Sequence, residues 1–263
     1  MQLKQLHYPQ KYAKEMPLMR KEIEVQVEQM KQLLQECRQV VSKMTEQKEL
    51  RQFLYECNKD TISVDNSHFE HIVSYLNGLY KRYDYVYLSY IGSSQNEDAI
   101  DNNGRSRQKE CMNKEREKYI LTERCWYKEM LTEKKFPAIL SPVRDTSGSY
   151  IISTVSEIHN ANQESMGIVG IDITIPMLVK KMNTERHCIL LTADGEIIYD
   201  SDPIANGAIH RKYNIKMLLD KEVVKNILKN EIGGCESRYD NKKILLAYAP
   251  IIENKYYLLF LTN

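Results

Sequence analysis

The stretch formed by residues 119–127 holds the side chains best suited to bind a small anionic molecule. Arg124 offers a rigid fork of donors that fits a carboxylate. The chain's only tryptophan, Trp126, and the tyrosines Tyr119 and Tyr127 combine apolar rings with an N–H or O–H donor. The combination suits a small pocket for an anionic or zwitterionic molecule. The residue types leave one alternative open, in which Trp126 and Tyr127 are core aromatics and Arg124 lies on a helix surface.

Catalytic and metal-binding patterns are missing from the sequence. It contains no G-x-S-x-G, no H-E-x-x-H and no phosphate-binding glycine loop. The six cysteines are dispersed and none forms a C-x-x-C pair, which argues against a metal site or a redox motif. Cys125 lies beside Arg124, where its thiol could be activated, but its helix position predicts a core-facing side chain. We therefore expect no enzyme, no metal and no cofactor.

Composition excludes a second class of function. The 263 residues carry 37 basic and 36 acidic side chains, a net charge of +1, and nucleic-acid binding needs a clear basic excess. No apolar run approaches the roughly 20 residues that span a bilayer, and the first residues lack the apolar stretch of a signal peptide. We expect a polypeptide that is soluble as given, and an ectodomain cut from a membrane protein would show the same composition.

The N-terminal part of the chain predicts one long helix. Residues 12–57 contain no glycine and one proline, Pro17. Apolar residues recur at alternating intervals of four and three, the pattern of a heptad seam: Ile23, Val27, Met30, Leu34, Cys37, Val41 and Met44. The pattern slips after Met44 and resumes at Leu50. We expect a helix of about 40 residues, roughly 60 Å long. Its seam either packs on a twin helix in a homodimer or lies against the chain's own sheet, and both can hold.

The remaining sequence predicts two antiparallel sheets with helices on them, an α+β fold. A strand at 85–91 is followed by a long polar loop, 93–118, of a length that is usually functional, and then by a short helix at 126–134. The further expected elements are strands at 138–143, 149–158 and 166–175, a helix at 176–182, strands at 188–192 and 196–199, a helix at 220–230, and strands at 236–239, 243–250 and 256–262. We divide the chain into a helix, 1–58, a larger module, 59–185, and a smaller one, 186–263.

This arrangement resembles the double Cache (dCache) sensor domains over nearly the whole chain. Arg124-x-Trp126-Tyr127 resembles the family's R-x-W-Y, and Tyr119 lies five residues before the arginine, as in amino-acid-binding members. Residues 167–173 are similar to the G-V-V-G-x-D strand, whose aspartate corresponds to Asp172. In those members this aspartate meets the ligand ammonium.

The resemblance implies a function and a set of site residues. It implies a long N-terminal helix followed by two PAS-like modules, with a ligand in the membrane-distal one. The chain would be the extracytoplasmic part of a membrane-anchored chemoreceptor, sensor histidine kinase or diguanylate cyclase, homodimeric through its N-terminal helix. The implied ligand-binding residues are Tyr119, Arg124, Trp126, Tyr127 and Asp172.

One position departs from the family pattern. Amino-acid-binding relatives carry Tyr-x-Asp before the hairpin at 147–148, where this chain has Pro142 and Arg144. An inward Arg144 would add a second cation and favour a dicarboxylate or an acidic amino acid. Asp145 is adjacent, but neighbouring strand residues face opposite sides unless the strand bulges. We expect the ligand to be a small carboxylate-bearing molecule: an amino acid, a dicarboxylate or similar. The alternative is a ligand-independent dimerisation or partner-binding module, with the seam as its interface and a vestigial pocket.

Overall fold

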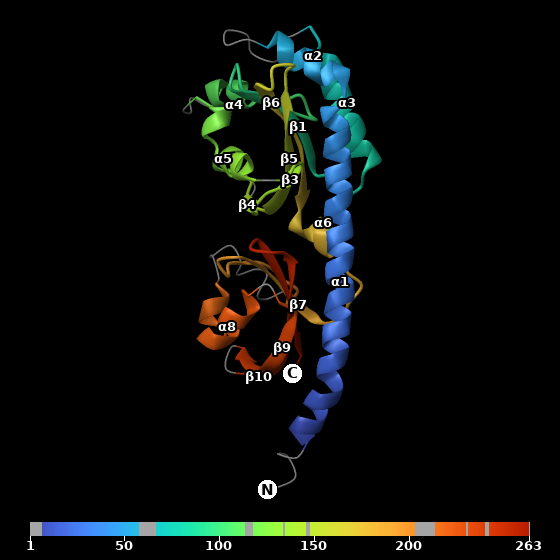
Figure 1. Cartoon of the computed structure of the whole chain (residues 1–263), viewed down its shortest axis with the longest axis vertical. Helices are drawn as coiled ribbons and strands as arrows, with labels where there is room; N and C mark the ends of the chain where they lie inside the picture. The colour runs from blue at the N-terminus through green and yellow to red at the C-terminus, as the bar shows by residue number, and fades with distance from the viewer. Residues whose placement is uncertain are drawn as a thin grey trace. The chain divides into compact units, whose positions relative to one another are not determined.

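The computed structural model is an α+β fold with two antiparallel sheets (Figure 1). It describes residues 7–57, 67–113, 118–133, 135–145, 148–202, 214–229, 231–239 and 242–262. The chain forms two compact units, which we describe separately. The six-stranded unit comprises Leu34–Asp145 and Ser149–Thr174, and the five-stranded unit comprises Met1–Leu33, Thr146–Gly148 and Ile175–Asn263. Residues on either side of the expected boundary at 58 and 59 lie outside the described part of the chain.

The expected long helix ends earlier than the apolar pattern suggested. Helix α1 spans His7–Thr45, 39 residues, and a separate helix α2 follows at Lys48–Glu56. Side chains donate hydrogen bonds to backbone carbonyl groups that the end of α1 would otherwise leave unpaired. Thr45 Oγ1 donates to Ser42 O, Gln47 Nε2 to Lys43 O and Arg51 Nε to Thr45 O. The chain then restarts with a new direction that buries Leu50 and its neighbours. The slip in the heptad pattern after Met44 marks this break.

The heptad seam of α1 is buried within the single chain. All seven seam residues are at most 4% exposed. Those up to Met30 belong to the five-stranded unit and those from Leu34 onward to the six-stranded unit. Of the two placements left open by the sequence, the structure therefore shows the helix lying against its own chain. The homodimer stays a prediction and would need another face of α1.

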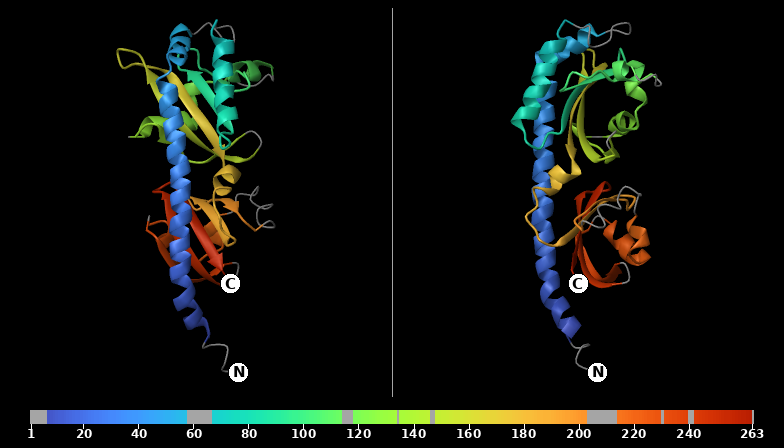
Figure 2. Two further views of the ribbon diagram at one scale, coloured as in Figure 1. Left: turned by 90° about the vertical axis from the view of Figure 1, so that its right-hand side faces the viewer. Right: turned by 180° about the vertical axis from the view of Figure 1, so that it is seen from behind.

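The six-stranded unit has strand order β2-β1-β6-β5-β3, with β4 also paired to β5. The strands are β1 (Leu88–Ser93), β2 (Asp98–Asp101), β3 (Ala138–Ile139), β4 (Val143–Arg144), β5 (Tyr150–His159) and β6 (Ser165–Thr174). On one side of the sheet lie α2 and α3 (Phe69–Arg82), and on the other lie α4 (Arg107–Asn113) and α5 (Cys125–Thr132), as Figure 2 shows. The 3₁₀ turn η2 (Leu121–Glu123) immediately precedes α5. All strand pairs are antiparallel.

Two expectations for this unit were wrong in detail. The polar stretch 93–118, expected as a loop with at most one helical turn, contains the strand β2 as well as α4. In β2 the aspartates Asp98 and Asp101 are buried together with Ala99 and Ile100, so the strand lacks the alternation of polar and apolar residues that would predict it. The strand expected at 138–143 is divided into β3 and β4, although Leu140 N still donates to Ser153 O. Pro142 has no N–H for the ladder, which explains the interruption.

The five-stranded unit has strand order β8-β7-β11-β10-β9. Its elements are α6 (Ile175–Val179), β7 (His187–Thr192), β8 (Ile197–Asp200), η4 (Ile215–Met217), α8 (Lys221–Ile227), β9 (Gly233–Tyr239), β10 (Lys242–Ile252) and β11 (Tyr256–Thr262). The strands and α8 agree with the sequence expectation, while α6 is shorter than predicted. Among the described residues, no helix has a stretch long and apolar enough to cross a membrane.

Candidate ligand-binding site

Asp172, one of the predicted ligand residues, lies on the face of the six-stranded sheet that is opposite α3. Leu88 and Ser153 both pair directly with Asp172, so these three side chains point to the same face. Tyr90 and Gly170 form the neighbouring row of the same face. The opposite face packs against α3, since Ser89 Oγ donates to the carbonyl of Leu76 in that helix.

Asp172 is a buried carboxyl group with two hydroxyl partners. It is 5% exposed, and Ser153 Oγ donates to its Oδ1 at 2.7 Å. Burial raises the pKa of Asp172 to about 7, although hydrogen bonds from Ser153 and Tyr90 and the charge of Arg107 act in the opposite direction. A cationic group placed next to this carboxyl would favour its ionised form. Asp172 is therefore suited to receive the ammonium end of a ligand.

Gly170 makes room for Tyr90 beside Asp172. A β-carbon at position 170 would lie 2.6 Å from both Cζ and Oη of Tyr90, closer than van der Waals contact permits. The bare backbone of the strand lets the phenol ring pass over it, so that the hydroxyl reaches the carboxyl group of Asp172. The second glycine of the G-x-x-G-x-D pattern thus has a steric role in the site.

The segment 119–127 approaches this row through aromatic contacts. Trp126 meets the rings of Tyr90 and Tyr127 edge-on, each at 6.1 Å between centroids. Arg124 is the N-terminal flanking residue of α5 and is exposed, with its guanidinium carbon 5.5 Å from the centroid of the Tyr119 ring. The structure thus brings Tyr119, Arg124 and Trp126 together next to Tyr90.

Tyr127 differs from its neighbours in burial. It is 4% exposed and belongs to the apolar core of the unit, while Tyr119 and Trp126 are only partly buried against that core. The fully buried members of this core are Tyr90, Ala99, Leu121, Tyr127, Met130, Ala138, Leu140, Val155 and Ile168. A direct ligand contact by Tyr127 stays a prediction. Its observed contacts are those of a core aromatic that supports Trp126.

The sequence expectation missed Arg107, a cation on the same side of the sheet. Burial raises the pKa of Tyr119 to about 12, and the charges of Arg124 and Arg107 both oppose that rise. Arg107 therefore influences both Tyr119 and Asp172. It is ion-paired with Glu110, at 3.0 Å, and lies 3.9 Å from the buried Asp101. The only sequence signal for it was its location in a long polar stretch before the motif.

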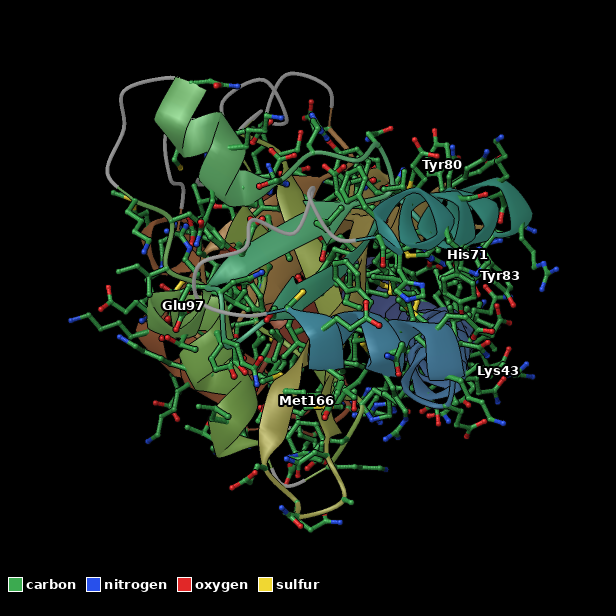
Figure 3. All side chains as sticks on the ribbon, turned by 90° about the horizontal axis from the view of Figure 1, so that it is seen from above. Lys43, His71, Tyr80, Tyr83, Glu97 and Met166 are labelled. Carbon is green, nitrogen blue, oxygen red and sulfur yellow. The ribbon has the colours of Figure 1, made fainter. Side chains whose placement is uncertain are left out.

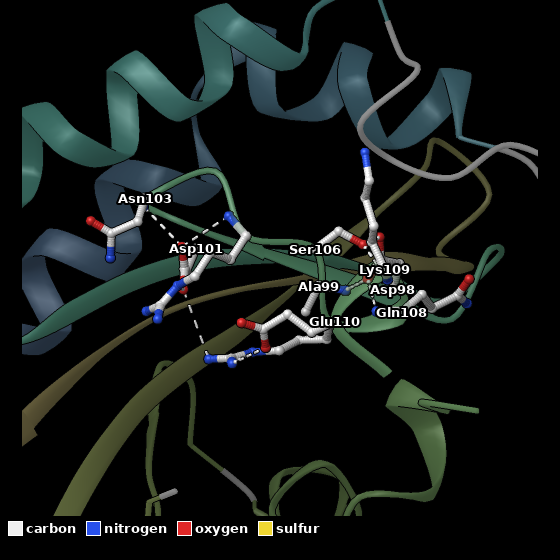
Figure 4. A network of polar contacts seen from close by, with 10 residues as sticks. Asp98, Ala99, Asp101, Asn103, Ser106, Gln108, Lys109 and Glu110 are labelled. Carbon is white, nitrogen blue, oxygen red and sulfur yellow. Dashed lines mark hydrogen bonds and ion pairs between the residues drawn. The ribbon is translucent and has the colours of Figure 1, made fainter. Parts of the chain in front are cut away.

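A polar network anchors the start of α4, which carries Arg107 (Figure 4). Asp98 accepts hydrogen bonds from Ser106 Oγ and Gln108 N, at 2.7 and 3.0 Å. Asp101 accepts one from Arg105 Nε at 2.8 Å. Both carboxylates are at most 1% exposed, and they are satisfied by these donors.

The register of β4 separates Arg144 from Asp145. Val143 pairs with Ile151, which lies on the same face as Asp172, whereas Arg144 pairs with Tyr150 on the other face. The guanidinium of Arg144 stacks on the Tyr150 ring at 4.5 Å and donates to its hydroxyl. A ligand-binding role for Arg144 stays a prediction, and strand alternation does not favour it.

Asp145 lies close enough to act on Asp172, although the alternation of strand residues had suggested that it would face away. It follows Val143 by two residues and accepts a hydrogen bond from Tyr87 Oη at 3.2 Å. Its negative charge contributes to the raised pKa of Asp172. Asp145, rather than Arg144, is therefore the charged residue of this segment that acts on Asp172, in addition to Arg107.

A depression of about 680 Å³ lies elsewhere, in the five-stranded unit, and is lined by Glu22, Asn183–His187, Leu261 and Thr262. Arg186 in this depression is already paired with Glu15 and Glu22, and His187 with Asp200. Its charges are thus compensated within the chain. We place the candidate site at Asp172, where the chemistry converges, and not at this depression.

Comparison with known proteins agrees with the fold described above. Neither a protein-family model nor a curated protein matches the chain by sequence. Among solved structures, the ligand-binding domain of the Campylobacter jejuni chemoreceptor Tlp3, in complex with L-norvaline, aligns with a TM-score of 0.65 at 14% identity, covering 95% of this chain and 91% of that one. The chain has the double Cache fold.

Two further double Cache structures align over similar lengths. The extracellular domain assigned to the histidine kinase soHK1S-Z6 gives a TM-score of 0.66 at 14% identity, covering 97% of this chain and 96% of the other. The ligand-binding domain of the Pseudomonas aeruginosa chemoreceptor PctB, in complex with L-Gln, gives 0.61 at 12% identity, covering 93% and 89%. The expected long helix followed by two antiparallel-sheet modules is thereby confirmed.

Proposed function

We propose that this chain is the extracytoplasmic sensor domain of a transmembrane signalling receptor and binds a small carboxylate-bearing molecule in its six-stranded unit. The observation that carries this proposal is the hydrogen-bonded group of Ser153, Asp172 and Tyr90 on two neighbouring rows of the sheet, which Trp126 connects to the segment of Arg124. The group holds a buried acid, and the segment holds an exposed fork of donors. The output domain would be that of a chemoreceptor, a histidine kinase or a diguanylate cyclase.

The two ends of the site suit the two ends of an amino acid. Arg124 binds the ligand carboxylate through charge-assisted hydrogen bonds, and the Trp126 N–H adds a further donor. Asp172 accepts the ammonium, and Asp145 adds negative charge on the same side. The proteins of the same fold support this ligand class, because L-norvaline and L-Gln are each named in complex with one of them. The positive charge of Arg107 near Asp172 is suited to an additional acidic group on the ligand.

The proposed division of labour follows the family arrangement. Residues 59–185 form the membrane-distal, ligand-binding module, and residues 186–263 the membrane-proximal one. Helix α1 contributes residues to both units, so a ligand that favours one arrangement of the sheet around α1 shifts the helix and passes a signal to the membrane. A homodimer formed through an outer face of α1 would transmit such a shift.

A binding screen tests the proposal. Thermal-shift and calorimetric titrations use L-norvaline, L-glutamine, γ-aminobutyrate and succinate. We expect at least one to stabilise the protein, and Arg124→Ala to abolish that stabilisation without lowering the melting temperature of the free protein. Lys128→Ala, at another exposed position of α5, serves as the matched control. Stabilisation that persists in Arg124→Ala would remove the assigned site.

The alternative, a ligand-independent dimerisation or partner-binding module, would need an interface other than the one expected from the sequence. It used the seam from Ile23 to Met44 as the interface, and this seam is buried within the chain.

A further inference from the structure

The turn between β1 and β2 holds Glu97 in an unusual backbone conformation. Its φ is +58°, in the left-handed region that non-glycine residues seldom adopt. Such a conformation persists only where the surrounding contacts enforce it, and it often marks a functional position. The contacts of the Glu97 side chain therefore indicate what the turn is for.

The Glu97 carboxylate grips the segment that carries the candidate arginine. Thr122 N donates to its Oε2 and Thr122 Oγ1 donates to its Oε1, both at 2.9 Å. Both oxygens are used, and both bonds involve a charged acceptor, which makes them stronger than neutral hydrogen bonds. Thr122 lies in η2, only two residues before Arg124. Figure 3 shows Glu97 on the α5 side of the sheet, away from Lys43, His71 and Tyr83, which lie on the α3 side.

The backbone transmits this grip to α5. Arg124 N donates to Leu121 O, and Lys128 N donates to Arg124 O, so η2 continues directly into the helix. Leu121 is fully buried and packs closely on β1, because a β-carbon at Gly92 would lie 2.9 Å from its Cδ2. The position of Thr122 therefore determines where α5 begins, and with it the positions of Arg124 and Trp126.

The same turn also holds the second cationic segment. The side-chain amide of Gln108 donates to the carbonyl of Asn96, and Asp98 accepts from Ser106 and from Gln108 N. Residues 96–98 thus contact both α4, with Arg107, and η2, before Arg124. One tight turn fixes the two arginine-bearing segments relative to the strand that bears Tyr90.

We propose that Glu97 is a positioning residue for ligand recognition: its carboxylate, held by the left-handed turn, clamps Thr122 and sets Arg124 and Trp126 against Tyr90. The consequence for ligand binding rests on the function proposed above. The positioning itself does not, since Trp126 is the only tryptophan and reports its own environment without any ligand.

Glu97→Gly is the main test, because glycine adopts a positive φ without strain and the turn is therefore kept. We expect a red-shifted tryptophan emission and a higher acrylamide quenching constant in the ligand-free protein, which should still unfold in one cooperative transition. Gln163→Gly is the matched control. Gln163 also has a left-handed φ, +65°, but is exposed in the β5–β6 turn. It should leave emission and quenching unchanged.

Binding gives the second measurement, with L-norvaline and L-glutamine as probes. Loss of a pair of charge-assisted bonds that orient Arg124 should weaken binding by about tenfold or more in Glu97→Gly. If none of the four compounds of the binding screen binds the unaltered protein, the proposed function fails, while the fluorescence result still judges Glu97. Should Glu97→Gly not fold, Glu97→Gln and Thr122→Val decide, because each removes part of the clamp and should raise quenching in part. Tryptophan emission and quenching identical to the unaltered protein in the variants that fold would overturn the proposal.

Discussion

Gly170 lies directly beneath the ring of Tyr90. A β-carbon at position 170 would lie only 2.6 Å from the phenol oxygen of Tyr90. This contact between neighbouring strands lets Tyr90 place its hydroxyl beside Asp172 and its ring against Trp126. The candidate site therefore depends on the absence of a side chain at one position of β6.

The first prediction concerns this glycine. Gly170→Ala forces Tyr90 out of its position, and overpacking of this kind costs about 1–3 kcal/mol of unfolding free energy. We expect a lower urea midpoint, altered emission of Trp126 and loss of ligand binding. Gly78→Ala in α3 is the control, since a β-carbon there meets nothing and alanine favours the helix. Equal stability of the two variants would contradict the steric role of Gly170.

The second prediction follows from the carboxyl group of Asp172. Its pKa rises from the ordinary 3.8 to about 7 in the folded protein, so the native state holds its proton more tightly than the unfolded chain. The resulting stabilisation is complete below about pH 4 and is lost as the pH rises to about 7. Asp172→Asn should remove this loss. The difference in unfolding free energy, variant minus unaltered protein, should therefore increase as the pH rises from about 4 to about 7. Urea unfolding at several pH values measures this difference. A constant difference would contradict the shifted pKa.

Arg107 provides the third prediction. Its positive charge lowers the pKa of Asp172 in the folded protein. Arg107→Gln should therefore raise that pKa further and move the pH dependence of amine-ligand binding to higher pH, whereas Arg107→Lys, which keeps the charge, should move it less. Calorimetric titrations across the neutral range would measure the shift. Identical pH profiles for both variants would show that Arg107 acts only through its ion pairs with Glu110 and Asp101.

The fourth prediction concerns the seam of α1. Leu34 is 2% exposed, and Leu34→Ala should reduce the unfolding free energy by about 2–5 kcal/mol. The loss should be independent of protein concentration, because the seam packs within the chain. Val25 is 48% exposed, and Val25→Ala should change the unfolding free energy by less than about 0.5 kcal/mol. Urea unfolding at two well-separated protein concentrations distinguishes this from a dimer interface, for which the loss would depend on concentration.

The resemblance to double Cache domains, and not local periodicity, singled out Arg124, Trp126 and Asp172. The structure links two of these segments, because Trp126 contacts Tyr90 on the strand that pairs with β6, which carries Asp172. Arg107 and Glu97 could not be found this way. Their roles come from contacts with residues distant in sequence, such as Glu97 with Thr122, and no local period or motif marks such contacts.

The sequence by itself determined that α1 has one apolar face and that the strands alternate, because periodicity follows from backbone geometry. It did not determine what covers that face, since a heptad seam fits a partner helix as well as the chain's own sheet. Nor did it determine the register of β4, where a shift of one residue exchanges Arg144 for Asp145 beside Asp172. Only the tertiary structure decided these points, because strand register and helix packing arise from contacts between segments far apart in the chain.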